Sequence, residues 1–147
     1  MEENIVEQKI TVLIERVDRL KQYKAISLQE LTQNRDVKDI VERNLQVAIE
    51  VCLDIGKIII SDQKLREPQD NKDVFQVLAE NNIISKEKLT FLIQMAGARN
   101  ILVHGYNKID SEIVLGVLRK HLNDFYKYIG EIQKNYLTGD EKEGKDE

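Results

Sequence analysis

Three polar side chains that can bind a phosphate or move a proton interrupt an apolar stretch in the second half of the chain. Arg99, His104 and Tyr106 lie within the string Arg-Asn-Ile-Leu-Val-His-Gly-Tyr. Arginine carries a permanent positive charge on a planar group that donates several hydrogen bonds to phosphate oxygens. Histidine has the unperturbed pKa nearest neutrality, and tyrosine adds a hydroxyl. This combination suits a site that holds a phosphate and transfers a proton.

The relative placement of these side chains depends on where their helix ends. At about 100° per residue, an unbroken helix would place Arg99 and Tyr106 on nearly one face and His104 roughly 140° from Arg99. Gly105 follows His104, and glycine readily takes the left-handed conformation found just past a helix C-terminus. A helix that ends there would let His104 and Tyr106 turn back toward Arg99. Arginine and histidine at this spacing also occur on ordinary solvated helices, so spacing alone does not establish a site.

The residues around this string resemble those of a known family. The pattern R-N-x-L-V-H-x-Y, followed by residues 109–114, resembles the signature of the HepT-like proteins of the HEPN superfamily, which are small helical ribonucleases and usually toxins. The stretch from Val41 to Gly56 also resembles the second helix of that family. Two positions depart from the family pattern, which more often has a bulky apolar residue at the position of Ala98 and an acid at that of Gly105.

The resemblance implies a metal-independent endoribonuclease that acts on RNA without a cofactor. RNA supplies its own nucleophile, the ribose 2′-hydroxyl, so the protein has only to move protons and stabilise charge on phosphorus. We expect His104 to act as general base or acid, Arg99 to hold the scissile phosphate and its developing charge, and Asn100 to orient the phosphate or His104. The sequence contains no convincing Cys/His cluster and no H-E-x-x-H, G-x-x-x-x-G-K or G-x-G-x-x-G pattern. We therefore predict neither a metal site nor a cofactor.

The resemblance also implies two protein partners. HepT-like toxins form homodimers in which two copies of the motif meet in a basic cleft, and each toxin is paired with a small nucleotidyltransferase antitoxin. In that family the antitoxin transfers AMP to the tyrosine that matches Tyr106. The added negative charge and bulk would exclude RNA from Arg99 and His104. The alternative is that Tyr106 only packs over the helix end and hydrogen-bonds His104.

Two other functions remain open from the sequence. One is a non-catalytic HEPN-type domain that binds a nucleotide or a partner nucleotidyltransferase, and the other is a structural helical adaptor. The intact Arg-Asn-His-Tyr set favours the enzyme over both, since an adaptor does not need those residues near a helix end.

Three further titratable residues are weaker candidates. Glu50 and Asp54 are four residues apart and share a helical face, a spacing that suits a metal ion or an acid–base pair. A solvated face or salt-bridge partners are the commoner explanation. His121 lies among charged helix residues, so we expect it to face solvent and leave it outside the site.

Composition limits the class of protein and the way in which it can bind RNA. With 41% hydrophobic and 33% charged residues, the 147-residue chain suits one helix-rich domain. The formal net charge is −4, of which residues 139–147 contribute −3 through five acids and two lysines, so the remaining body carries −1. RNA must therefore be held by a local basic patch. The single cysteine and the absence of a signal peptide or membrane span predict a cytoplasmic protein.

Apolar periodicity and capping residues predict an all-α, up-and-down bundle of four to five main helices that resembles the HepT-like fold. Ser27 and Glu30 form a capping box, and Asp73 and Ser85 are candidate helix caps. Gly97 and Ala98 are small, which lets another backbone or a phosphate approach beside Arg99, and close helix packing explains them equally well. We predict one helical domain over residues 1–137 and an acidic disordered tail over 138–147. The expected helices cover residues 4–24, a short segment at 28–31, 36–61, 73–80, 86–104 and 110–136.

Overall fold

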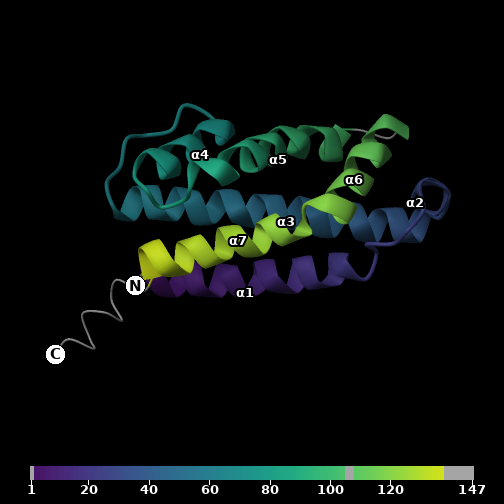
Figure 1. Ribbon diagram of the computed structural model, residues 1–147, viewed down its shortest axis with the longest axis horizontal. Coiled ribbons are helices and arrows are strands. Elements are labelled where there is room, and N and C mark those ends of the chain that lie inside the picture. The colour runs from purple at the N-terminus through teal and green to yellow at the C-terminus, as the bar shows by residue number, and fades with distance from the viewer. Residues whose placement is uncertain (1, 105–107, 138–147) are drawn as a thin grey trace.

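Figure 1 shows an all-helical bundle in which the packed helices α1, α3, α5 and α7 alternate in direction along one axis. The computed structural model describes residues 2–104 and 108–137, and it describes the side chains of residues 2–97 and 111–137. The alternating helices are α1 (Glu2–Lys21), α3 (Arg35–Asp62), α5 (Lys86–His104) and α7 (Leu122–Ile132). Between and after them lie α2 (Leu28–Gln33), α4 (Asn71–Glu80), α6 (Lys108–Lys120) and the π-helical segment η1 (Gln133–Leu137). The predicted all-α bundle is confirmed, and no strand occurs in these ranges.

Helix α3 is the centre of the core. It begins after Asn34, whose side-chain oxygen accepts a hydrogen bond from the Val37 amide at 3.2 Å, which satisfies one free amide of the first turn. Its 28 residues then run without proline, and α1, α2, α4 and α5 all pack against it. Figure 1 shows α1 and α7 along one side of α3 and α4 and α5 along the other. The apolar residues that α3 buries are Val41, Leu45, Ala48, Ile49, Val51, Cys52, Leu53, Ile55, Ile59 and Ile60.

Helix α4 approaches α3 closely at Gly56. A Cβ atom at this position would lie only 2.6 Å from Val74 Cγ1 and 3.2 Å from Leu78 Cδ1, both on α4. On the same stretch of α3, the fully buried Tyr128 of α7 donates its hydroxyl proton to the Cys52 carbonyl at 2.9 Å. Because the glycine lets α4 approach closely and the tyrosine satisfies a buried carbonyl, α3, α4 and α7 are fixed relative to one another.

The helix predicted over residues 110–136 is interrupted at His121. This residue has φ −123° and ψ 1°, outside the helical region, and it precedes α7. Its ring stacks on Phe91 of α5 with centroids 5.1 Å apart, and its Nδ1 lies 3.0 Å from Asp124 Oδ2. His121 was expected to face solvent; 39% of its side chain is exposed, and its ring also packs on Phe91. Its tertiary contacts explain why α6 and α7 form two helices at an angle (Figure 1).

Two of the predicted caps can be compared with the structure. The Ser27 hydroxyl accepts a hydrogen bond from the Glu30 amide at 3.1 Å, so the start of α2 is confirmed. The cap of α4 is Asp70 and not Asp73, because the Asp70 carboxylate accepts from the Asp73 amide at 2.8 Å. The predicted tail over residues 138–147 lies outside the described residues. None of the described helices is long and apolar enough to cross a membrane.

Candidate functional site

The final turns of α5 carry three of the four residues of the predicted site. Arg99, Asn100 and His104 lie in this helix, which is described as far as His104, and Gly105 lies outside the described residues. Their side chains, and Tyr106 as a whole, lie outside the described residues. The site is therefore characterised by the backbone that carries the motif and by the described side chains around it.

Helix α5 extends well past its neighbour α4. The two helices pack against each other and are joined by residues 81–85. They have 10 and 19 residues, and at about 1.5 Å per residue α5 continues past the start of α4 by roughly nine residues. Figure 1 shows α4 beside the first part of α5 only. The motif thus lies on a stretch of α5 that α4 itself does not cover.

Lys72, in the first turn of α4, lies against α5 just before the motif. A Cβ atom at Gly97 would be 3.5 Å from Lys72 Cε and 3.9 Å from Lys72 Nζ. The space that Gly97 was predicted to leave is thus occupied by the stem of a lysine. Lys72 is exposed and makes no hydrogen bond or ion pair within the part of the chain that the structure describes. Sequence reasoning missed this exposed cation beside α5.

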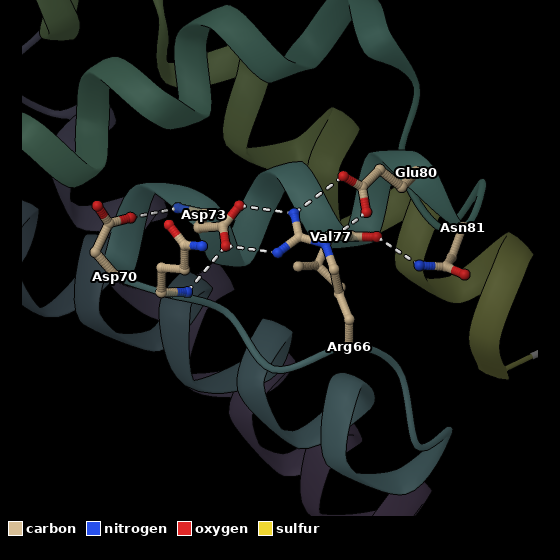
Figure 2. A network of polar contacts seen from close by, with 7 residues as sticks. Arg66, Asp70, Asp73, Val77, Glu80 and Asn81 are labelled. Atoms are coloured by element: carbon tan, nitrogen blue, oxygen red, sulfur yellow. Dashed lines mark hydrogen bonds and ion pairs between the residues drawn. The ribbon is translucent and has the colours of Figure 1, made fainter.

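On its other side, the start of α4 is held by Arg66 from the loop after α3. Figure 2 shows the Arg66 guanidinium between Asp73 and Glu80. It donates to both Asp73 oxygens at 2.8 Å and to both Glu80 oxygens at 2.9 Å. The Gln69 amide adds a bond to Asp73 at 2.9 Å. These charge-assisted bonds fix the loop on α4.

The same contacts govern the titration of this cluster. Hydrogen bonds from Arg66, then from the Gln69 amide, lower the pKa of Asp73 to about 2. The Arg66 hydrogen bond also lowers the pKa of Glu80. In turn, hydrogen bonds from the two carboxylates raise the pKa of Arg66 above its ordinary value. Both carboxylates are thus held ionised by a single arginine.

The helix that follows the motif is anchored to α3. Ser111, in the first turn of α6, is buried with 1% of its surface exposed. Its hydroxyl oxygen lies 3.5 Å from Lys38 Nζ, and Lys38 is paired with Glu42 one turn later in α3. A buried hydroxyl needs a polar partner, so this contact fixes α6 close behind the motif.

The secondary candidates Glu50 and Asp54 both take part in structural contacts. Glu50 accepts a hydrogen bond from Gln46 Nε2 at 3.1 Å, and Asp54 lies 3.6 Å from Lys9 Nζ of α1. Among the described residues there is no group of three or more histidine, cysteine, aspartate or glutamate side chains that could hold a metal ion. The contacts of Glu50 and Asp54 therefore agree with the salt-bridge explanation of their spacing.

The chain is similar to proteins of known class over almost its whole length. The model of the family described as "Ribonuclease HepT-like" matches residues 13–132, which include the motif. An "mRNA nuclease HepT" of Shewanella oneidensis is 35% identical over 130 residues, which cover 88% of this chain and 97% of that protein. A "tRNA nuclease HepT" of Aphanizomenon flos-aquae is 28% identical over 138 residues, which cover 94% of each chain.

Solved structures give the same comparison in three dimensions. A toxin–antitoxin complex with AMP-PNP contains a chain with TM-score 0.82 and 34% identity, covering 89% of this chain and 98% of that one. A tri-AMPylated Shewanella oneidensis HEPN toxin in complex with MNT antitoxin gives TM-score 0.79 and 35% identity, covering 88% and 97%. A cytosolic protein from Bacillus subtilis has the same fold at TM-score 0.78 and 19% identity.

Proposed function

This chain belongs to the ribonuclease HepT-like family and is a ribonuclease, and we propose that it is a cytoplasmic toxin that cleaves RNA through Arg99 and His104. The observation that carries this proposal is the position of the motif. Arg99, Asn100 and His104 occupy the last turns of α5, and the helix ends at His104 within the segment that the family model matches. Helix α5 thus carries Arg99 in its last turns and His104 as its last residue.

The proposed reaction needs only the RNA and these side chains. The ribose 2′-oxygen forms a bond to phosphorus, and the bond from phosphorus to the 5′-oxygen of the next nucleotide breaks. The products are a 2′,3′-cyclic phosphate and a 5′-hydroxyl. His104 takes the proton from the 2′-hydroxyl or gives one to the leaving oxygen, while Arg99 stabilises the charge that develops on the phosphate oxygens. Asn100 orients the phosphate or His104.

Purified protein tests this reaction directly. Single-stranded RNA should be cut in the presence of a metal chelator, and sequencing of the fragments with their end groups should find cyclic phosphates or their hydrolysis products. Loss of cleavage in the chelator, restored by added metal, would contradict the metal-independent mechanism. Uncut RNA under all conditions would contradict the ribonuclease activity itself.

Two copies of the chain would complete a basic cleft. The body carries a formal charge of −1 without its acidic tail, so one motif alone gives RNA few cations to bind. A homodimer that brings two motifs together doubles the local positive charge without making the whole surface basic. Light scattering at micromolar concentration should give the mass of a dimer, and a strictly monomeric species would contradict this arrangement.

Tyr106 is the proposed control point, modified with AMP by a nucleotidyltransferase antitoxin. Two similar structures are toxin–antitoxin complexes, and one contains a tri-AMPylated toxin. The hydroxyls of three described tyrosines already donate hydrogen bonds: Tyr126 to Asp18, Tyr128 to the Cys52 carbonyl and Tyr136 to Asp62. Burial is the main cause that raises the pKa of all three. These tyrosines are therefore poor acceptors of a transferred nucleotide.

The test of this control uses the antitoxin and ATP. After co-expression with a cognate nucleotidyltransferase, intact mass should rise by one or more adenylyl units that map to Tyr106. Tyr106→Phe should lack the modification, and Tyr23→Phe, which removes a half-buried tyrosine elsewhere, should keep it. If the partner fully inhibits Tyr106→Phe, control runs through complex formation and not through this hydroxyl.

A further inference from the structure

We propose that Lys72 is an RNA-binding residue, and that its ammonium group holds a phosphate of the strand beside the one cut at Arg99 and His104. The assignment rests on the ribonuclease function proposed above and names a substrate contact outside the motif. The carrying observation is that the stem of Lys72 lies against Gly97, two residues before Arg99, at the point where α5 leaves the cover of α4.

Helix geometry places Lys72 on the face of α5 that carries positions 100 and 104, whereas position 99 lies roughly 160° from Gly97 around the helix axis. At about 100° per residue, Asn100 lies roughly 60° and His104 roughly 20° from Gly97 around the helix axis. At about 1.5 Å per residue, they lie roughly 4.5 Å and 10.5 Å farther along it. Positions 97, 100 and 104 thus lie in one row along the helix, and Lys72 lies beside the N-terminal member of this row, Gly97. A strand that follows this row from His104 toward α4 reaches Lys72 next.

The charges around Lys72 leave it available for a ligand. The nearest acids in sequence are Asp70 and Asp73, and both carboxylates accept hydrogen bonds from groups other than Lys72. Asp73 is bound to Arg66 and the Gln69 amide, and Asp70 accepts from the Asp73 amide. Lys72 is exposed and has no partner among the described side chains.

A phosphodiester is the ligand class that fits this cation. Lysine presents a point charge on a flexible stem, which suits a phosphate whose position varies with RNA sequence. Gly97 supports the role because a side chain larger than that of alanine would occupy the place of the lysine stem. The competing explanation is that Lys72 lays its stem on α5 only to keep its charge in water. The two explanations differ in the salt dependence of RNA binding.

The test compares Lys72→Gln with Lys86→Gln and Lys72→Arg in the full chain. Lys86 is an exposed lysine at the opposite end of α5. The probe is a fluorescent single-stranded RNA that the wild-type protein cleaves, with kcat and KM measured from low to high salt. Loss of one phosphate contact to a single strand reduces the slope of log KM against log salt by about 0.7 and raises KM about fivefold at 0.1 M salt. We expect this of Lys72→Gln, with kcat unchanged and with wild-type values in the other two variants.

The circular-dichroism spectrum and the unfolding midpoint of each variant show whether it folds like the wild type. If Lys72→Gln keeps the wild-type KM and salt slope while the wild-type chain cuts RNA, Lys72 does not bind the strand and only the ribonuclease proposal survives. An equal change in Lys86→Gln would overturn the assignment as well, because the effect would then come from general charge. A wild-type chain that cuts no RNA contradicts the proposed function and this contact with it.

Discussion

The two sides of α4 use charge in opposite ways. On the side of the loop, Arg66 is bound to Asp73 and Glu80 by four hydrogen bonds between 2.8 and 2.9 Å (Figure 2). On the side of α5, the ammonium of Lys72 lies beside Gly97 without a described partner. The charge of Arg66 is used in contacts within the fold, and the charge of Lys72 is available for a ligand. A change on the first side should alter stability, and a change on the second should alter RNA cleavage.

Replacing an arginine by alanine in each region should give the largest difference in RNA cleavage rate. Removal of a group that stabilises transition-state charge costs about 100- to 1000-fold in rate, so Arg99→Ala should cleave RNA at least that much more slowly. Arg66→Ala should cleave at close to the wild-type rate. Single-turnover cleavage measures both, and the helical spectrum of Arg99→Ala should remain. Equal losses in the two variants would show that the charges of the two regions are not independent.

Gly56→Ala should give the largest loss of stability that a single methyl group can cause in the described core. The new Cβ would lie 2.6 Å from Val74 Cγ1, and overpacking of this kind costs about 1–3 kcal/mol. Urea unfolding followed by circular dichroism measures the change. A wild-type midpoint in Gly56→Ala would mean that α4 moves away from α3 at little cost.

Arg66→Ala should lower the urea midpoint at neutral pH by a smaller amount, because the Arg66 cluster is exposed. Its pH dependence follows from the lowered pKa of Asp73, which is about 2 in the folded chain. A carboxylate with a lowered folded pKa stabilises the fold above its ordinary pKa and loses that effect as pH falls through the folded value. The midpoints of wild type and Arg66→Ala should therefore converge between about pH 4 and pH 2. A gap that stays constant over this range would contradict the ion pair as the cause.

Gly97→Ala should show the smallest effect and the opposite sign from Gly56→Ala. The new Cβ would meet Lys72 Cε at 3.5 Å, an ordinary contact. Alanine is favoured over glycine inside a helix by about 0.5–1 kcal/mol, so the urea midpoint should rise slightly. The KM for RNA should stay unchanged because the lysine stem keeps its place. A loss of stability here would mean that α4 and α5 pack more tightly than the distances indicate.

Local patterns in the sequence predicted the local features of the fold. The start of α2 follows from the Ser27 capping box, and the bounds of α5 agree with the helix predicted over residues 86–104. The break at His121 was not predictable, since the apolar spacing continues through it and the break depends on Phe91, 30 positions earlier in the chain.

Contacts between distant residues also explain what was missed near the site. Asp70 and Asp73 are both acceptable helix caps by sequence, and the choice is made by Arg66, which binds Asp73. The space at Gly97 was predicted, but its occupant, Lys72, lies 25 positions earlier and reaches it only because α4 folds back along α5. Sequence alone thus located the motif but not the cation beside it.

The central claim is that the His104 side chain moves a proton during RNA cleavage, and chemical rescue tests it most directly. The measurement is the single-turnover cleavage rate of His104→Ala with and without added imidazole. A general acid or base contributes about 100- to 10,000-fold, so the variant should lose that much activity, and imidazole should restore part of it in proportion to its concentration. Arg99→Ala should gain nothing from imidazole. A His104→Ala protein that cleaves RNA at the wild-type rate would contradict the claim.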